Sequence, residues 1–223
     1  MNFEKLSNLT ELLQKRVIGD PIWIDKKNVF EYSVQSVEVV AVLKAIRAVH
    51  GIKSMQILCE KGLFIDMGAI YRCVNDCCEE IHFLLEKYPK TSSDVDQFVK
   101  AFFESTIDNY LNAQTSYLPI RKIHSASVRI LEKYGSNPPV RDLIRKIYKT
   151  GSGYIHAGYV NIMGMYGGSK PNFNLGGVPS LKERAKYIEL VETASVSVSQ
   201  AIAFGAYKFG LKDISKEILE SLE

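Results

Sequence analysis

Residues 63–87 read LFIDMGAIYRCVNDCCEEIHFLLEK, and this stretch decides the fold class. Its apolar residues recur every three or four positions, which is the spacing of one face of an α-helix. The opposite side carries Arg72, Asp76 and Glu79, but it also holds Phe83. A fully solvated face rarely carries large apolar residues above and below its charges, as Ile65 and Phe83 would lie here, so we expect a helix that is covered on both sides.

The three charged residues of this helix allow two interpretations. Arg72, Asp76 and Glu79 could form a purely structural network, in which the guanidinium holds both carboxylates ionised. They could instead support a binding site in a partly enclosed gap. The helical spacing favours the structural interpretation and leaves the second open.

The same periodicity predicts helices on both sides of this stretch. We therefore expect an all-α bundle of seven to nine helices with one glycine-rich loop or short hairpin. A connector at 20–30 is expected to tuck the only tryptophan, Trp23, against the body. The predicted helices cover residues 3–17, 31–49, 52–60, 63–87, a segment that begins at 91–94, 117–134, 139–156, 180–209 and 212–222.

One domain spanning 1–223 accommodates all of these helices, because no breaker separates segments of different type. Its parts are an N-terminal helix and connector (1–30), a helical core (31–157), a glycine-rich excursion (158–178) and C-terminal helices (179–223). The excursion contains two short runs with alternating apolar residues around a Gly-Gly-Ser-Lys-Pro-Asn turn, which is typical of a hairpin.

Composition narrows the function classes. A hydrophobic content of 46% and a charged content of 24% are typical of a globular protein. No apolar run approaches the ~18 residues of a membrane span, and the N-terminus does not resemble a signal peptide. We therefore expect a cytoplasmic protein without membrane contact. Cys78 and His82 have the spacing of half a zinc site, but no second ligand pair follows, so no metal or cofactor is predicted.

The charge is unevenly distributed. The whole chain carries +3, whereas residues 121–150 alone carry eight basic and two acidic residues, a surplus of +6. A basic block beside a glycine-rich segment suits a phosphate-bearing partner. A solvated helix surface is the alternative, because Lys and Arg commonly cover exposed faces. The basic residues are Arg121, Lys122, Arg129, Lys133, Arg141, Arg145, Lys146 and Lys149.

Residues 149–159, KTGSGYIHAGY, are the predicted functional stretch. If the preceding helix continues into it, five side chains form one stripe: Arg141, Arg145, Tyr148, Ser152 and His156. Gly151 and Gly153 remove side chains from beside Ser152, which lets a ligand or another helix approach the backbone.

Each residue of this stretch has a predicted role. His156 could act as a general acid or base, and Ser152 as a ligand contact or a nucleophile. Arg141 and Arg145 could hold a phosphate, with Tyr148, Lys149 and Tyr154 as further ligand contacts. The alternative is that Ser152 and His156 only fasten the start of the excursion to a neighbouring helix by hydrogen bonds. No third member of a catalytic triad is apparent.

The motifs of the chain also carry a resemblance. Ala69-Ile70-Tyr71-Arg72 through Glu79, then Tyr148 with Ser152-Gly153-Tyr154-x-His156, then Met165-Tyr166-Gly167-Gly168 are similar to motifs of a group of bacterial all-helical proteins. That group in turn distantly resembles the HEPN superfamily. The resemblance covers about residues 30–210. It implies a helical fold and a nucleotide-binding or metal-independent ribonuclease function, as in toxin and phage-defence systems.

The chain departs from the superfamily at one position. HEPN ribonucleases place an arginine five to seven residues before the catalytic histidine, near a dimer interface. At those offsets from His156 this chain has Gly151, Thr150 and Lys149. The catalytic arginine therefore has no counterpart here, and a lysine does not reproduce its planar fork.

These observations lead to two expectations for function. The first is a protein, expected to be a homodimer, that binds a nucleotide or nucleic-acid phosphate along the stripe from Arg141 to His156, with RNA cleavage at His156 left open. The second is a non-catalytic assembly protein that uses the small residues of 180–209 and the glycine-rich segment.

Overall fold

The computed structural model describes residues 2–104, 118–133, 140–167 and 171–222. The chain is 73% helical and has nine helices and two small sheets among these residues, so the predicted all-α bundle is confirmed. The same residues contain no helix with the length and apolarity to cross a membrane. The helices are α1 (Phe3–Val17), α2 (Val37–Glu60), α3 (Phe64–Leu85), α4 (Ser93–Glu104), α6 (Ile120–Lys133), α7 (Val140–Ile155), α8 (Tyr159–Met163), α9 (Leu181–Lys208) and α10 (Lys212–Glu220).

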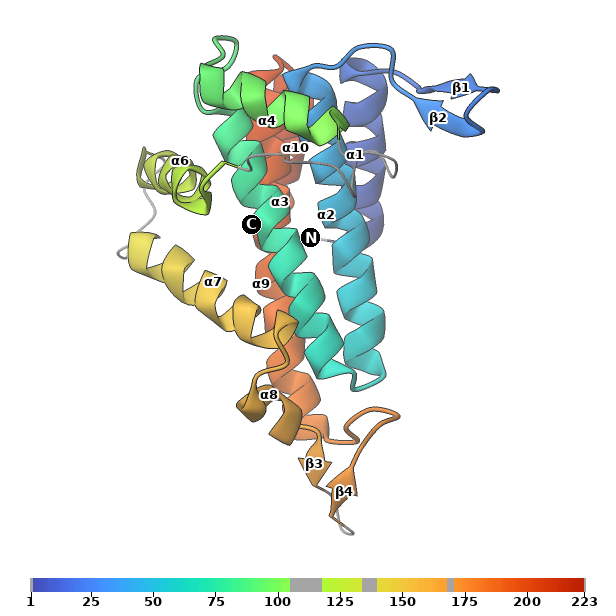
Figure 1. Ribbon diagram of the computed structural model, residues 1–223, viewed down its shortest axis with the longest axis vertical. Coiled ribbons are helices and arrows are strands. Elements are labelled where there is room, and N and C mark those ends of the chain that lie inside the picture. The colour runs from blue at the N-terminus through green and yellow to red at the C-terminus, as the bar shows by residue number, and fades with distance from the viewer. Residues whose placement is uncertain (1, 105–117, 134–139, 168–170, 223) are drawn as a thin grey trace.

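Three long helices, α2, α3 and α9, run side by side along the long axis of the molecule (Figure 1). Helices α1 and α10 pack at one end of this group, and α6 and α7 lie on the other side of α3. Helix α3 is thus enclosed by α2 and α9 on one side and by α6 and α7 on the other. This arrangement agrees with the expectation that its charged side would be covered.

Helix α2 starts later than predicted and has no break in its middle. The expected helix at 31–49 begins only at Val37, where the Ser36 hydroxyl accepts a hydrogen bond from the Val39 amide. It then continues through Gly51 to Glu60 instead of stopping. Gly51 serves packing, because a Cβ atom there would lie 2.4 Å from a methyl group of Val74 on α3. The glycine lets the two helices approach closely.

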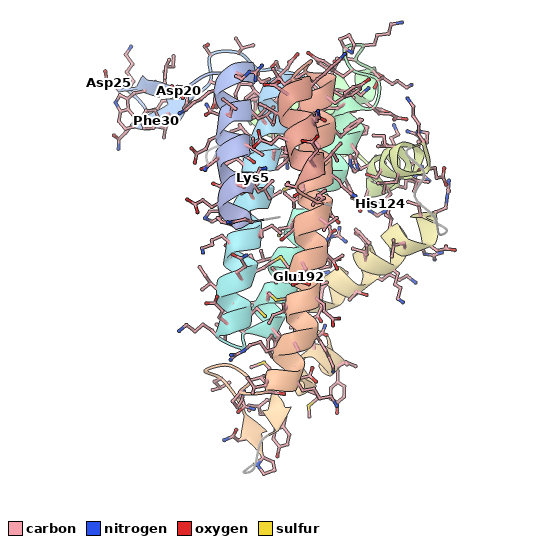
Figure 2. All side chains as sticks on the ribbon, turned by 180° about the vertical axis from the view of Figure 1, so that it is seen from behind. Lys5, Asp20, Asp25, Phe30, His124 and Glu192 are labelled. Atoms are coloured by element: carbon pink, nitrogen blue, oxygen red, sulfur yellow. The ribbon has the colours of Figure 1, made fainter. Side chains whose placement is uncertain are left out.

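The connector at 20–30 is a β-hairpin, and the prediction that Trp23 packs against the body is wrong. Strands β1 (Ile22–Ile24) and β2 (Val29–Glu31) pair in antiparallel register and project from the bundle (Figures 1 and 2). Trp23 packs edge-on against Phe30 of the opposite strand at 4.9 Å and remains 46% exposed. The aromatic pair therefore stabilises the hairpin itself and is not part of the core.

The glycine-rich excursion contains a short helix as well as the expected hairpin. Helix α8 occupies part of the first predicted strand, and strands β3 (Tyr166–Gly167) and β4 (Asn172–Phe173) follow. The segment then returns to the turn between α2 and α3, where the Val178 amide donates to the Gly62 carbonyl at 3.0 Å. At Gly177, with a φ of +113°, a Cβ atom would lie 1.9 Å from the Lys61 carbonyl oxygen, so only glycine fits.

Helix α9 begins after a capping residue, because the Ser180 hydroxyl accepts a hydrogen bond from the Glu183 amide. Most of its small residues are buried against α2, α3 and α10 and hence serve close packing within the chain. They do not form a free surface for assembly. The buried small residues are Ala194, Ser199, Ala201, Ala203, Gly205 and Ala206.

Candidate phosphate-binding site

Helix α7 carries the predicted site and crosses α3 at close range. Two glycines permit the crossing: a Cβ atom at Gly151 would lie 2.9 Å from Cδ of Arg72, and one at Gly68 would lie 2.3 Å from the Tyr154 ring. Its buried face is narrow. Leu143 and Ile155, two apolar residues of α7, are 47% and 49% exposed.

The end of α7 explains why the chain turns away after the predicted functional stretch. Gly158 donates its amide to the Gly153 carbonyl and Ala157 donates to Tyr154, which is the hydrogen-bond pattern of a Schellman motif. Ala157 adopts the left-handed conformation, with a φ of 47°, that this motif requires. His156 therefore lies in this turn, one residue after the end of α7, and is exposed.

Arg72 lies buried between α3 and α7, where it joins three groups. Its Nε and Nη2 atoms each lie 2.8 Å from an Asp76 carboxylate oxygen, and Nη1 donates to the Tyr148 carbonyl at 3.1 Å. The guanidinium also lies 3.5 Å from the centroid of the Tyr148 ring. The contacts of the Arg72 guanidinium with the Tyr148 carbonyl and the Tyr148 ring fasten α7 to α3, and the pair with Asp76 fixes the guanidinium in place. Tyr148, predicted to contact a ligand, thus packs against Arg72.

Glu79, the third member of the predicted network, contacts a residue that the sequence did not identify. Its Oε2 lies 3.1 Å from Nε2 of His124 on α6, although the orientation of the two groups is poor for a hydrogen bond. The His124 ring packs edge-on against Tyr148 at 5.0 Å. Figure 2 shows His124 on the side of the bundle away from α1. The periodicity within α3 contains no signal for this contact between helices.

Tyr154, the other tyrosine predicted to contact a ligand, is also a packing residue. Its ring covers Gly68, and its hydroxyl lies 3.2 Å from the Tyr187 hydroxyl of α9. Tyr187 in turn stacks on Phe64 at 4.2 Å. Burial and the hydrogen bond with Tyr154 raise the pKa of Tyr187, so the Tyr187 hydroxyl stays protonated at neutral pH.

Buried polar groups on α3 are kept neutral by their surroundings. Burial raises the pKa of the Cys77 thiol to about 12 and lowers the pKa of His82 to about 4. His82 lies 3.3 Å from the Ser127 hydroxyl of α6. Cys78 and His82 are both buried, and the described ranges contain no group of three or more side chains that could hold a metal ion.

Acid is expected to destabilise the protein through His82. Its pKa is lower in the folded than in the unfolded chain, so the unfolded state binds the proton first as the pH falls below about 6.5. Between pH 7 and pH 5 this group should cost about 2 kcal/mol of the free energy of unfolding. Urea titrations of wild type and His82→Gln at both pH values measure this fall in the free energy of unfolding. The prediction would be contradicted if the free energy of unfolding fell equally in the two proteins.

The basic residues of the stripe on α7 are exposed, and the stripe extends along the whole helix. Arg141, Arg145 and Lys149 follow one another at four-residue intervals and are exposed, and none makes an ion pair with another described residue. Arg141 and His156 are separated by about 22 Å along the helix axis. A single phosphate therefore cannot contact both ends of the stripe, whereas a chain of phosphates can.

Ser152 and His156 lie one turn apart at the end of this stripe. Ser152 is half-buried and His156 is exposed. Neither side chain makes a hydrogen bond or an ion pair with any other residue in the described part of the chain. The hydrogen bonds that were expected to fasten the excursion are therefore missing in the described ranges, and neither side chain has an activating partner there.

All basic residues of the 121–150 block are exposed on α6 and α7, which pack against each other. On each helix four of them fall within an arc of about 140°, at 100° per residue. Glu132 and Asp142 are the acids that accompany them on these helices. We call this set the basic surface: Arg121, Lys122, Arg129, Lys133, Arg141, Arg145, Lys146 and Lys149.

A pocket of about 530 Å³ is lined by three cations of the basic surface on α6 and by one on α7. It lies between the end of α3, the start of α4 and α6, and Arg141 reaches it from the first turn of α7. We call it the basic pocket. Its charged lining comprises the cations Lys87, Lys90, Arg121, Lys122, Arg129 and Arg141 and the anions Glu86 and Asp94.

No family model, curated protein or solved structure matches the chain. The class of protein that the described residues define is thus a helical bundle with an exposed basic surface on one side. Function has to be inferred from that surface.

Proposed function

We propose that this protein binds nucleic acid, and that the basic surface contacts the phosphate backbone. The observation that carries the proposal is the exposure of all eight cations of the surface, accompanied by only two acids on the same helices. Phosphate contacts of this kind supply most of the affinity in sequence-independent binding. The surface has the charge that such binding needs.

The length of the stripe favours a nucleic acid over a single nucleotide. Arg141, Arg145 and Lys149 are spaced about 6 Å apart along α7, so they present charge repeatedly along one line. A mononucleotide would reach only one or two of these side chains. A strand with several phosphates can engage them all, and its release of counterions then drives binding.

Base recognition is a smaller part of the proposal. Tyr148 and Tyr154, the aromatic residues of α7, are engaged by Arg72 and Tyr187. Stacking on bases requires a free aromatic face. Binding through α7 should therefore depend weakly on sequence. RNA cleavage by His156, whether or not in a defence system, stays a prediction, because the described residues offer His156 no partner.

The proposal is tested with Arg145→Ala combined with Lys149→Ala. Fluorescence anisotropy with short single-stranded and double-stranded RNA should show about a tenfold loss of affinity, from two lost charge-assisted contacts at an exposed surface. The matched control is Lys15→Ala with Lys212→Ala, which removes the same charge from α1 and α10. If both double variants bind like wild type, or lose affinity equally, the basic surface is not the site.

The assembly alternative keeps one observation in its favour. The small residues of α9 are used inside the chain, but the excursion and the start of α9 expose apolar side chains at their tip. Tyr159, Val160, Leu175 and Leu181 are each between 78% and 80% exposed. The homodimer itself stays a prediction.

A further inference from the structure

The basic pocket has more positive charge than a backbone phosphate needs. Six cations and two anions line it, which leaves a surplus of four positive charges. It differs from the α7 stripe in shape, because its cations come from α6, α7 and the segment after α3 and line one volume. A concave site with converging charges selects a compact ligand, whereas the stripe suits an extended one.

Two ion pairs hold the walls of this pocket together. Lys122 of α6 lies 2.7 Å and 2.9 Å from the two carboxylate oxygens of Asp94 on α4. Arg129 of α6 forms a two-pronged pair with Glu86, just beyond α3, with one bond of 2.7 Å. Both acids of the pocket are therefore occupied, and they fix α6 against α3 and α4.

The remaining four cations have no acidic partner. Lys87, Lys90, Arg121 and Arg141 make no ion pair with any residue of the described ranges. Two of them are arginines on different helices, and each offers a fork that matches two phosphate oxygens. The pocket is thus lined by four cations without an acidic partner in the described ranges and by two that are paired.

The charge surplus discriminates between phosphate ligands. A phosphate monoester carries about −2 and would neutralise half of the surplus, whereas a chain of three phosphoryl groups carries about −4. We propose that the basic pocket binds an oligophosphate group of two or three phosphoryl units. Such a group is borne by a nucleoside triphosphate or by the 5′ end of a triphosphorylated RNA.

The size and floor of the pocket fit the rest of such a ligand. Its volume of about 530 Å³ exceeds what a phosphate chain fills and lies within the usual range of small-molecule sites. Phe83, Leu84 and Val95 form an apolar part of the lining, and Ser92 and Ser125 add hydroxyl groups. An apolar floor below a charged rim suits a nucleoside attached to the phosphates.

Isothermal titration calorimetry of the full chain with inorganic triphosphate, at constant ionic strength, tests this proposal. We expect one site, with inorganic phosphate binding at least tenfold more weakly. Arg121→Gln combined with Arg141→Gln should weaken triphosphate binding by about tenfold or more, because two charge-assisted forks are lost. Both residues are exposed, so the variant should fold; its helical circular dichroism checks this.

The control is the Lys15→Ala, Lys212→Ala variant, which should bind triphosphate like wild type. Wild type that does not bind triphosphate, or a pocket variant that binds it unchanged, overturns the proposal. Competition by 5′-triphosphorylated against 5′-hydroxyl RNA of one sequence then separates the two sources. If the triphosphorylated strand competes better, the ligand of the pocket is the 5′ end of an RNA. If the two strands compete equally and a nucleoside triphosphate binds more strongly than either, the ligand is the free nucleotide.

This inference rests on the proposed function, since it assigns a ligand class to one end of the same basic surface. The two can nevertheless fail separately. Suppose that the Arg145→Ala, Lys149→Ala variant loses RNA binding while wild type does not bind triphosphate. This result would support the proposal that the basic surface contacts the phosphate backbone and would contradict the proposal for the basic pocket. If triphosphate binding depends on Arg121 and Arg141 but the protein does not bind RNA, the pocket proposal is supported and the proposed nucleic-acid binding is contradicted.

Discussion

Replacing Arg72 with methionine is expected to lower the free energy of unfolding by about 3 kcal/mol. The substitution keeps the stem that packs beside Gly151 but removes the bonds to Asp76 and to the Tyr148 carbonyl. The side chain of Asp76 is 34% exposed and can recover water, so the loss should fall at the lower end of the range for buried pairs. Urea denaturation followed by circular dichroism measures it.

A surface ion pair in the same protein provides the control. Arg16 pairs with Asp213, and their side chains are 40% and 63% exposed. Arg16→Met should leave the free energy of unfolding close to that of wild type, because water screens exposed pairs. If Arg72→Met is as mild as Arg16→Met, Arg72 does not fasten α7 to α3.

Gly68→Ala is expected to cost about 2 kcal/mol, although alanine is the better helix former. The new methyl group would lie 2.3 Å from the ring of Tyr154, and that ring cannot retreat without losing its contact with Tyr187. The crossing of α3 and α7 would have to open. Chemical denaturation of the variant gives the change in free energy.

Two further variants identify the cause of this loss. Gly205→Ala places a methyl group 3.6 Å from Leu85, an ordinary contact, and should stabilise α9 by up to about 1 kcal/mol. In a Tyr154→Ala background, Gly68→Ala should no longer be harmful, because the ring that it strikes is gone. A penalty that persists in that background would contradict the packing account.

Much of the fold could be predicted because it depends on local pattern. The apolar spacing of residues 63–87 identifies α3 from neighbouring residues alone. In the same way, the Ser180 hydroxyl three residues before Glu183 identifies the start of α9. The errors arose where distant parts of the chain meet. Gly51 resembles a helix break in sequence, and only the position of Val74 on α3 shows that it permits close packing. Trp23 looks like a core residue until its hairpin partner is known.

The site was predictable to a smaller extent, for the same reason. The basic block identified α6 and α7, because charge density is a property of consecutive residues. The helical stripe placed Tyr148 beside Arg145, but nothing in the sequence shows that Arg72 comes from α3 to cover its ring. His124 beside Glu79, and Lys87 and Lys90 beside Arg121, likewise depend on which helices become neighbours.

The salt dependence of RNA binding tests the central claim most directly. For a single strand the slope of log K against log salt is about −0.7 for each neutralised phosphate, so contacts by Arg141, Arg145 and Lys149 alone predict about −2 or steeper. Arg145→Ala with Lys149→Ala should make the slope about 1.4 shallower. A shallower slope in this variant, and an unchanged one in Lys15→Ala with Lys212→Ala, is the predicted result. Salt-independent binding, or identical slopes in all three proteins, would contradict it.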